Sequence, residues 1–301
     1  MNINFKCLSL DDMDLINSYY KNCSVESYEY LFSSLYMWRK LNNVKYAVID
    51  DALVIEKNEE GKGTFYAQPL GYKKENLVSI IESLMERNQN YTDRDYLFGD
   101  VDENFISDLK KYTDYKVEVF EDVDDFEYVY NTHDLIELRG KKYHSKKNHV
   151  NTFEKTYSYE IRSINDDKVI KDCLELLHRW HEEVLETVDK EMCMEIDAIK
   201  DLFGELKFFD LKSIAVYVNN VLAGFAVGER VNDKMAVIHV ERGEIEFKGI
   251  YAFINRKFLM ECFAETEFVN RQEDTGNEGL RKAKESYHPV RMIKKYLVKL
   301  S

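Results

Sequence analysis

Hydrophobic and polar residues alternate in short stretches along the first 130 residues, and between these stretches apolar residues recur every three or four positions. Alternation predicts strands, and the longer period predicts helices. Ser9 and Asp12 have the spacing of a capping box, so a helix is expected to begin beside them. The predicted elements are a strand at 3–8, helices from Asp11 and at 26–41, a hairpin of strands 46–56 and 64–68, a helix at 75–87, a strand at 96–99, a helix at 103–112 and a strand at 115–120.

The second part of the chain repeats this order. Its predicted elements are a strand at 159–164, helices at 166–186 and 195–207, a meander of strands 213–218, 221–230 and 235–240, a helix at 249–264, a strand at 267–270, a helix at 277–287 and a strand at 292–300. The clearest overlay sets residues 96–100 and the helix after them against residues 267–271 and the helix after those. The pattern therefore predicts two structural copies.

A meander with a helix on each side, closed by a strand, a helix and a strand, resembles the GNAT acyltransferase fold. We expect an α/β (α+β) protein of two tandem GNAT-like units, each with a mostly antiparallel mixed sheet flanked by helices. Residues 1–130 would form the first unit, a scaffold or substrate-binding half. Residues 131–301 would comprise a basic helical connector (131–157) and the second, active unit. Many α+β proteins can be partitioned in this way, so element order alone does not decide the fold.

Composition limits the class of protein. With 45% hydrophobic residues, 2 Pro and 12 Gly in 301 residues, the chain has the composition of a folded protein rather than a collagen-like or low-complexity one. Its apolar stretches are far shorter than the ~18 to 20 residues that cross a bilayer, and no apolar leader follows Met1. We expect a cytoplasmic protein without an integral membrane segment. The five scattered cysteines, and His178 and His181 without a third ligand, predict no metal site.

Charge is distributed unevenly. The net charge is −14, and the first 130 residues carry 14 Lys and Arg against 26 Asp and Glu. Residues 139–155 reverse this balance, with six Lys and Arg and one Glu. Lys142, Lys146, Lys147 and His149 are candidate contacts to RNA phosphates, such as those of tRNA, because they lie close together at helical spacing. The alternative is a solvated helix that balances the acidic run at 121–127.

Two long motifs carry a more specific resemblance. They are LRGKKYHSKKNHVNTF at 138–153 and FVNRQEDTGNEGLRKAKESYHP at 268–289. Both resemble signatures of an uncharacterised bacterial family related to the C-terminal domain of phosphatidylglycerol lysyltransferases. The resemblance implies a tandem GNAT fold, similar to that of aminoacyl-tRNA-dependent transferases. The membrane-spanning half of the lysyltransferases has no counterpart here, which puts a lipid acceptor in doubt.

Acyl transfer needs a proton acceptor for the nucleophile, a donor to the developing oxyanion and a proton source for the leaving group. Glu241 ends a predicted strand, and Arg271, Glu273 and Asp274 follow the strand that Asn270 ends. Neighbouring strands splay apart in a GNAT-like unit, so these ends would meet. Glu241 and Glu273 are the candidate catalytic carboxylates, and the alternatives are an ion pair of Glu241 with Arg271 and helix capping by Glu273 and Asp274.

Tyr287 closes the next helix and is the candidate proton donor. Its alternative role is packing, because Leu280, Ala283 and Tyr287 have the spacing of a core-facing stripe. Arg281 and Lys284 share another stripe, which would bind phosphate or carboxylate or lie in solvent. The predicted substrate-binding residues are therefore Asn270, Arg271, Asp274, Arg281 and Lys284.

The turn that would hold a coenzyme A pyrophosphate reads ERGEIEFKG at 241–249. Lys248 and Gly249 open a helix there, as a phosphate site requires, but Glu244 and Glu246 would repel a pyrophosphate.

The sequence thus favours an acyl- or aminoacyl-transferase that acts on an amine or hydroxyl of a small molecule. Its donor would be an aminoacyl-tRNA, or an acyl-CoA in an alternative that acylates a small cationic amine, and no other cofactor is expected. A third alternative is a ligand- or RNA-binding module without catalysis.

Overall fold

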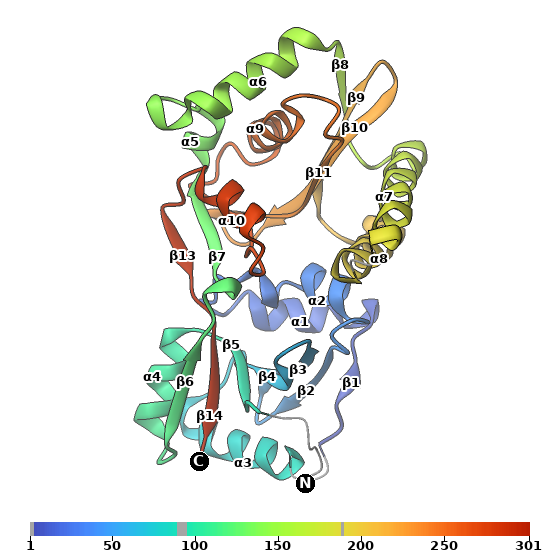
Figure 1. Ribbon diagram of the computed structural model, residues 1–301. Helices are drawn as coiled ribbons and strands as arrows, with labels where there is room; N and C mark the ends of the chain where they lie inside the picture. The colour runs from blue at the N-terminus through green and yellow to red at the C-terminus, as the bar shows by residue number, and fades with distance from the viewer. Residues whose placement is uncertain (1–2, 89–94, 188–189) are drawn as a thin grey trace. The chain divides into compact units, whose positions relative to one another are not determined.

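The computed structural model describes residues 3–88, 95–187 and 190–301, and it divides the chain into two compact units. Residues 1–126 and 293–301 form the first unit, and residues 127–292 form the second (Figure 1). Each unit contains a seven-stranded sheet with helices packed on it, and both sheets are mostly antiparallel. The predicted fold class is confirmed.

In the first unit the strand order is β1-β2-β3-β4-β5-β14-β6. The strands are β1 (Lys6–Cys7), β2 (Lys45–Ile49), β3 (Ala52–Glu59), β4 (Gly63–Ala67), β5 (Phe98–Val101), β14 (Tyr296–Leu300) and β6 (Val117–Glu121). The helices of this unit are α1 (Met13–Tyr20), α2 (Phe32–Trp38), α3 (Leu77–Asn88) and α4 (Glu103–Tyr112), with short 3-10 turns at η1 (Leu10–Asp12), η2 (Tyr28–Tyr30), η3 (Lys74–Asn76) and η4 (Val123–Asp125).

In the second unit the strand order is β13-β7-β12-β11-β10-β9-β8. The strands are β13 (Arg291–Ile293), β7 (Glu127–Asn131), β12 (Phe268–Asn270), β11 (Met235–Gly243), β10 (Val221–Arg230), β9 (Lys212–Val218) and β8 (Tyr159–Arg162). The helices are α5 (Thr132–Glu137), α6 (His144–Thr156), α7 (Asp167–Thr187), α8 (Lys190–Gly204), α9 (Ile250–Cys262) and α10 (Glu278–Glu285), with 3-10 turns at η5 (Lys141–Tyr143) and η6 (Leu206–Phe208).

The strands of each sheet do not follow the division expected from the sequence. β14 lies near the end of the chain but pairs with β5 and β6 of the first sheet, whereas β7 pairs with β12 of the second (Figure 1). The expected single strand at 292–300 is therefore two strands, β13 and β14, in different sheets. β7 was not expected, and it moves the division of the chain from residue 130 to residue 126. Periodicity reports which residues alternate but not which neighbour a strand pairs with.

A tight turn divides another of the expected strands, the one predicted at 46–56. The predicted strand at 46–56 is two strands, because Asp50 and Asp51 adopt positive φ angles of 48° and 67° and reverse the chain between β2 and β3. Positive φ at both central residues is the signature of a type I′ hairpin turn, which Asp tolerates. The expected capping box is present, since the Ser9 amide donates to the Asp12 carboxylate over 2.8 Å.

The core of the second unit lies between its sheet and α9. Phe253 of α9 stacks on Phe153 of α6 with 4.3 Å between ring centroids, and both rings are fully buried. This packing fixes α6 against α9. α10 and the loop before it are hydrogen-bonded to β7, since Tyr130 donates to the Lys284 carbonyl and Tyr128 to Asp274.

Candidate active site of the second unit

α10 turns a polar face inward. Lys284 is 8% exposed and Tyr287, just beyond the helix, is 6% exposed, whereas Leu280 is 41% exposed. Asn277 caps the helix, and its side chain accepts the Leu280 amide over 3.0 Å. Leu280 and Ala283 therefore form no core stripe, whereas Tyr287 does pack in the core of the unit, as its alternative role required. Buried polar side chains on a short helix need polar partners, and β7 and the loop after β12 supply them.

Glu241 and Arg271 form an ion pair, although Glu241 does not end its strand as predicted: β11 continues to Gly243, while Arg271 directly follows β12. The Arg271 guanidinium donates to Glu241 Oε1 over 3.0 Å, and the Asn255 amide of α9 donates to Oε2 over 2.8 Å. Both side chains are nearly buried. The structure thus brings Glu241 and Arg271 together, in the ion-pair arrangement, and adds Asn255, which the sequence analysis did not single out.

Tyr287 lies between cations and a second tyrosine. Arg271 Cζ is 4.6 Å from the centroid of its ring, and Lys146 Nζ of α6 is 4.0 Å from it. Tyr130 of β7 meets the ring edge to face, with 6.5 Å between centroids. Burial raises the pKa of Tyr287 to about 12, and the charge of Arg271 opposes that rise. The phenol is therefore protonated at neutral pH, as a proton donor must be.

Asp274 anchors the loop between β12 and α10. Its carboxylate accepts two hydrogen bonds from Arg281, over 2.8 and 2.7 Å, one from Tyr128 over 2.6 Å and one from the Gly276 amide over 3.0 Å. The Arg281 hydrogen bonds lower the pKa of Asp274 to about 2. Asp274 therefore acts as a fixed structural anion, and Asn277, not Glu273 or Asp274, caps α10.

Asn270 and Lys284 have different surroundings. Asn270 is fully buried, and its amide donates to Glu127 over 2.5 Å, so the structure places it inside the sheet. Lys284 Nζ donates to the Glu273 carbonyl, and the Lys284 carbonyl accepts the Tyr130 hydroxyl over 2.9 Å. Burial lowers the pKa of Lys284 to about 8, and the nearby charge of Glu273 opposes that shift.

Residues 22–299 match the family model described as phosphatidylglycerol lysyltransferase, C-terminal. The chain belongs to this family. A conserved protein of unknown function from Bacteroides thetaiotaomicron is similar with 30% identity and a TM-score of 0.88, covering 99% of this chain and 100% of that one. An uncharacterized protein of Mycoplasmoides gallisepticum is 26% identical over 176 residues, which are 58% of this chain and 56% of that protein, so the match spans about half of its length.

Two further structures show the fold. L-PGS from Bacillus licheniformis has a TM-score of 0.62 at 13% identity, covering 95% of this chain and 90% of that one. A tandem GNAT protein from the clavulanic acid biosynthesis pathway has a TM-score of 0.53 at 10% identity, covering 100% and 98%. The family and the fold support an acyl- or aminoacyl-transferase at this general level. Among the described residues, no helix is both long and apolar enough to span a bilayer.

Within this lysyltransferase-related fold, the 3-10 turn η5 and the helix α6 after it carry the basic residues predicted to contact RNA. Lys142 forms an ion pair with Asp134 of α5 at 3.1 Å, and Lys147 and His149 are exposed. Lys146 points instead toward Tyr287, and burial together with the charge of Arg271 lowers its pKa. The four residues thus divide between an outer surface and the group of buried and half-buried side chains around Tyr287. This group, the Tyr287 cluster, comprises Tyr287, Tyr130, Lys146, Glu241, Arg271 and Lys284.

The N-terminus of α9 is covered by the chain itself. Gly249 has a φ of 92°, and a Cβ added there would lie 2.2 Å from the His149 carbonyl oxygen of α6. The Lys248 amide donates to the Tyr157 hydroxyl over 3.2 Å. Glu244 is held by Arg179 over 2.8 Å. A pyrophosphate would have to displace these contacts, which weakens the acyl-CoA alternative.

The corresponding end of β5 in the first unit holds a closed ion cluster. Glu29, Glu59 and Asp100 come close enough to share a cation, but the Lys57 ammonium lies among them, 2.6 Å from Glu29, 3.8 Å from Glu59 and 2.8 Å from Asp100. Lys295 forms a second ion pair with Glu29, at 2.9 Å. An ammonium thus takes the place that a metal would need.

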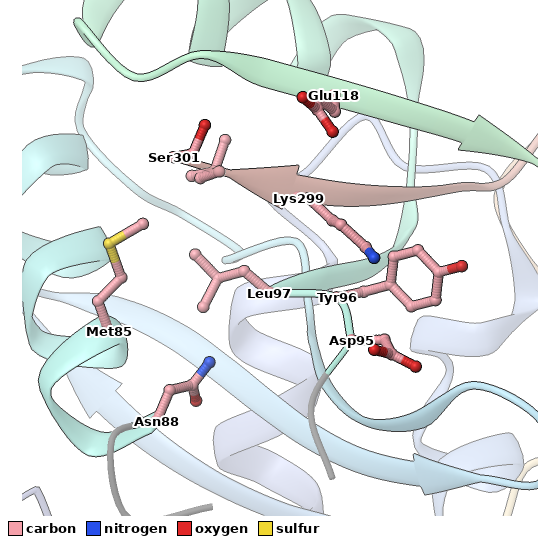
Figure 2. A pocket seen from close by; sticks show the side chains of 9 residues that line it. Met85, Asn88, Asp95, Tyr96, Leu97, Glu118, Lys299 and Ser301 are labelled. Carbon is pink, nitrogen blue, oxygen red and sulfur yellow. The ribbon is translucent and has the colours of Figure 1, made fainter. Parts of the chain in front are cut away.

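A cavity of about 300 Å³ also lies in the first unit (Figure 2). It opens between the end of α3, residues 95–97 just before β5, and strands β6 and β14, and none of the predicted site residues lines it. In Figure 2 the Lys299 ammonium points toward Tyr96, 4.9 Å from the centroid of that ring. We therefore place the candidate chemistry at the Tyr287 cluster, where the predicted residues meet.

Proposed function

We propose that this protein is an aminoacyl- or acyl-transferase whose reaction takes place at the Tyr287 cluster of the second unit. The observation that carries the proposal is the inward polar face of α10, where Lys284 and Tyr287 are buried beside the Glu241 and Arg271 pair. Burying charged and polar side chains on a helix whose Leu280 faces solvent lowers stability, and such arrangements gather at functional sites.

In the proposed reaction an acceptor amine or hydroxyl attacks the acyl carbonyl carbon, and the bond from that carbon to the leaving oxygen breaks. Tyr287 gives its phenolic proton to the leaving oxygen. Arg271 lies beside the Tyr287 ring and is held by Glu241, so its positive charge can stabilise the oxyanion that forms on the acyl group. Glu241 then acts through Arg271, because both of its oxygens already accept hydrogen bonds.

An aminoacyl-tRNA fits the donor role better than an acyl-CoA. Lys147 and His149 are exposed on α6, where they could contact phosphates. Lys146 of the same helix contacts the Tyr287 ring, so α6 connects this exposed surface with the proposed reaction centre. The contacts of Lys248 and Gly249 occupy the place of a pyrophosphate. The acceptor is proposed to be a small molecule.

The test is the transfer of radiolabelled aminoacyl groups from a charged-tRNA pool to an extractable acceptor. Tyr287→Phe removes the proton donor and is expected to lower the rate by roughly 10²-fold to 10⁴-fold. Tyr112→Phe, on α4 of the first unit, is the matched control and should transfer at the wild-type rate. Equal rates for wild type and Tyr287→Phe would contradict the assigned role, and no transfer by the wild type would favour the binding module.

Calorimetry with coenzyme A separates the alternative donor. We expect no heat of binding at high ligand concentration, because the chain already covers the α9 N-terminus. Micromolar binding would instead favour the acyl-CoA-dependent enzyme.

A further inference from the structure

Lys284 lies one helical turn before Tyr287, on the inward face of α10. Its ammonium donates to the Glu273 carbonyl, and its own carbonyl accepts the hydroxyl of Tyr130, whose ring packs on Tyr287. The main chain of Lys284 is therefore tied through Tyr130 to the Tyr287 ring, and its ammonium is held by the loop after β12 close to Arg271, which also lies against that ring.

Two of the carboxylates near Lys284, Glu241 and Asp274, are engaged elsewhere, and the third, Glu273, lies beside Lys284 and its negative charge raises the pKa of that amine. Glu241 accepts from Arg271 on one oxygen and from Asn255 on the other. Asp274 accepts from Arg281, Tyr128 and the Gly276 amide. A proton arriving at either carboxylate would have to displace a hydrogen bond or an ion pair that fixes the site, so neither is suited to accept one during each turnover.

We infer that Lys284 is the general base of the transfer reaction. This inference rests on the function proposed above. The neutral Nζ takes a proton from the acceptor amine or hydroxyl as that group attacks the acyl carbon, and becomes an ammonium. The bond from the acyl carbon to the leaving oxygen breaks, and that oxygen receives the Tyr287 proton. Transfer of the proton from Lys284 back to the phenolate restores both groups, so no further reactant is consumed.

The charges around Lys284 set the pH range in which it can act. Glu273, Asp274 and Arg271 face it from the loop after β12, Glu241 faces it from β11, and the Tyr128 ring of β7 lies 5.7 Å from Nζ. Tyr130, also of β7, bonds to its carbonyl. Burial and the positive charge of Arg271 favour the neutral amine, and the acids oppose them, which leaves a pKa of about 8. A base with a pKa near the working pH is neutral often enough to act and basic enough to take the proton.

The experiment measures kcat/KM for aminoacyl transfer between pH 6.5 and 9.5. The wild-type rate should rise with pH and level off with a midpoint near 8, where Lys284 loses its proton. Lys284→Ala should transfer roughly 10²-fold to 10⁴-fold more slowly and without this midpoint. Added methylamine should restore part of the rate in proportion to its concentration. Lys284→Arg keeps the charge but does not release a proton near neutral pH, so it should be as slow as Lys284→Ala.

Lys282→Ala is the matched control, because Lys282 lies two residues away on the exposed face of α10. It should keep the wild-type rate and midpoint. Circular dichroism identifies any variant that does not fold. Two Lys284 variants, Lys284→Arg and Lys284→Ala, are tested so that the inference can still be judged if one of them does not fold. A folded Lys284 variant with the wild-type rate and midpoint would overturn the inference while leaving the proposed function intact. A wild type that transfers no acyl group would instead overturn the proposed function.

Discussion

At the scale of single residues, the Tyr287 cluster contains ionisable side chains whose pKa values are shifted by burial toward the neutral form. Lys146 and Lys284 both have lowered pKa values because they are buried near Arg271, and the pKa of Tyr287 is raised. Placing Arg271 and Lys146 against the Tyr287 ring, with Lys284 buried near Arg271, lowers the stability of the fold, since desolvation opposes each charge. An incoming oxyanion would relieve part of this repulsion, which is consistent with acyl transfer.

The burial of Lys284 has a measurable effect on stability. In the unfolded chain this lysine keeps its proton up to its usual pKa of 10.5, and in the folded protein it releases the proton at about 8. Between these values the unfolded chain binds more protons, so the contribution of Lys284 to stability rises with pH.

Lys284→Met removes this dependence. Its free energy of unfolding relative to wild type should therefore fall, by up to about 3 kcal/mol, as pH rises from 8 to 10.5. Urea denaturation of both proteins at several pH values measures the difference, with Lys282→Met as control. A difference that stays constant over this range would contradict the burial of a titrating amine.

At the scale of elements, α6 serves two surfaces. Its inner side packs Val150 and Phe153 into the core and sends Lys146 to Tyr287, and its outer side exposes Lys147 and His149. Within their own units, Lys142 pairs with Asp134 and Glu121 pairs with Lys294.

If the outer side of α6 binds tRNA, affinity should depend on salt. Lys147→Ala should flatten the slope of log affinity against log salt concentration by about 0.7 to 0.9, the contribution of one phosphate contact. Lys171→Ala on α7, an exposed lysine beside Glu175, should leave the slope unchanged. Filter binding at several salt concentrations measures both slopes. Absence of tRNA binding by the wild type at low salt would contradict the proposed donor.

Some of these elements could be predicted from the sequence and others could not. Local signals were sufficient for the Ser9 and Asp12 capping box and for β12 with the helix after it, because neighbouring residues decide these features. They did not show which face of α10 is buried. Leu280 is the more hydrophobic residue, yet Lys284 is buried, because β7 and the loop after β12, which contact α10, carry acids, carbonyls and tyrosine hydroxyls.

At the scale of the whole chain, the second unit is continuous in sequence and the first is not. Residues 127–292 lie between β6 and β14, so the first sheet is completed only by the last residues of the chain. Strand pairing of this kind joins residues far apart in sequence, which local hydrophobic patterns cannot report. The expected division at residue 130 placed the last strand with the second unit for this reason.

Substitutions of Lys294 and Lys295, which directly precede β14, test which interactions hold β14 in the first sheet. Lys295 is 5% exposed and pairs with half-buried Glu29, whereas its neighbour Lys294 is 45% exposed and pairs with Glu121 at 3.7 Å. Lys295→Met removes one of two ion-pair partners of Glu29 and leaves Lys57, so it should destabilise the first unit by about 1 to 3 kcal/mol, less than the loss of a sole partner would. Lys294→Met breaks an exposed pair and should change stability by about 0 to 1 kcal/mol. Calorimetric melting with amide exchange assigns each loss to a unit, and exchange should accelerate in β5, β6 and β14 but not in β9 to β11. Equal effects of the two substitutions would show that the ion cluster does not hold β14 in the first sheet.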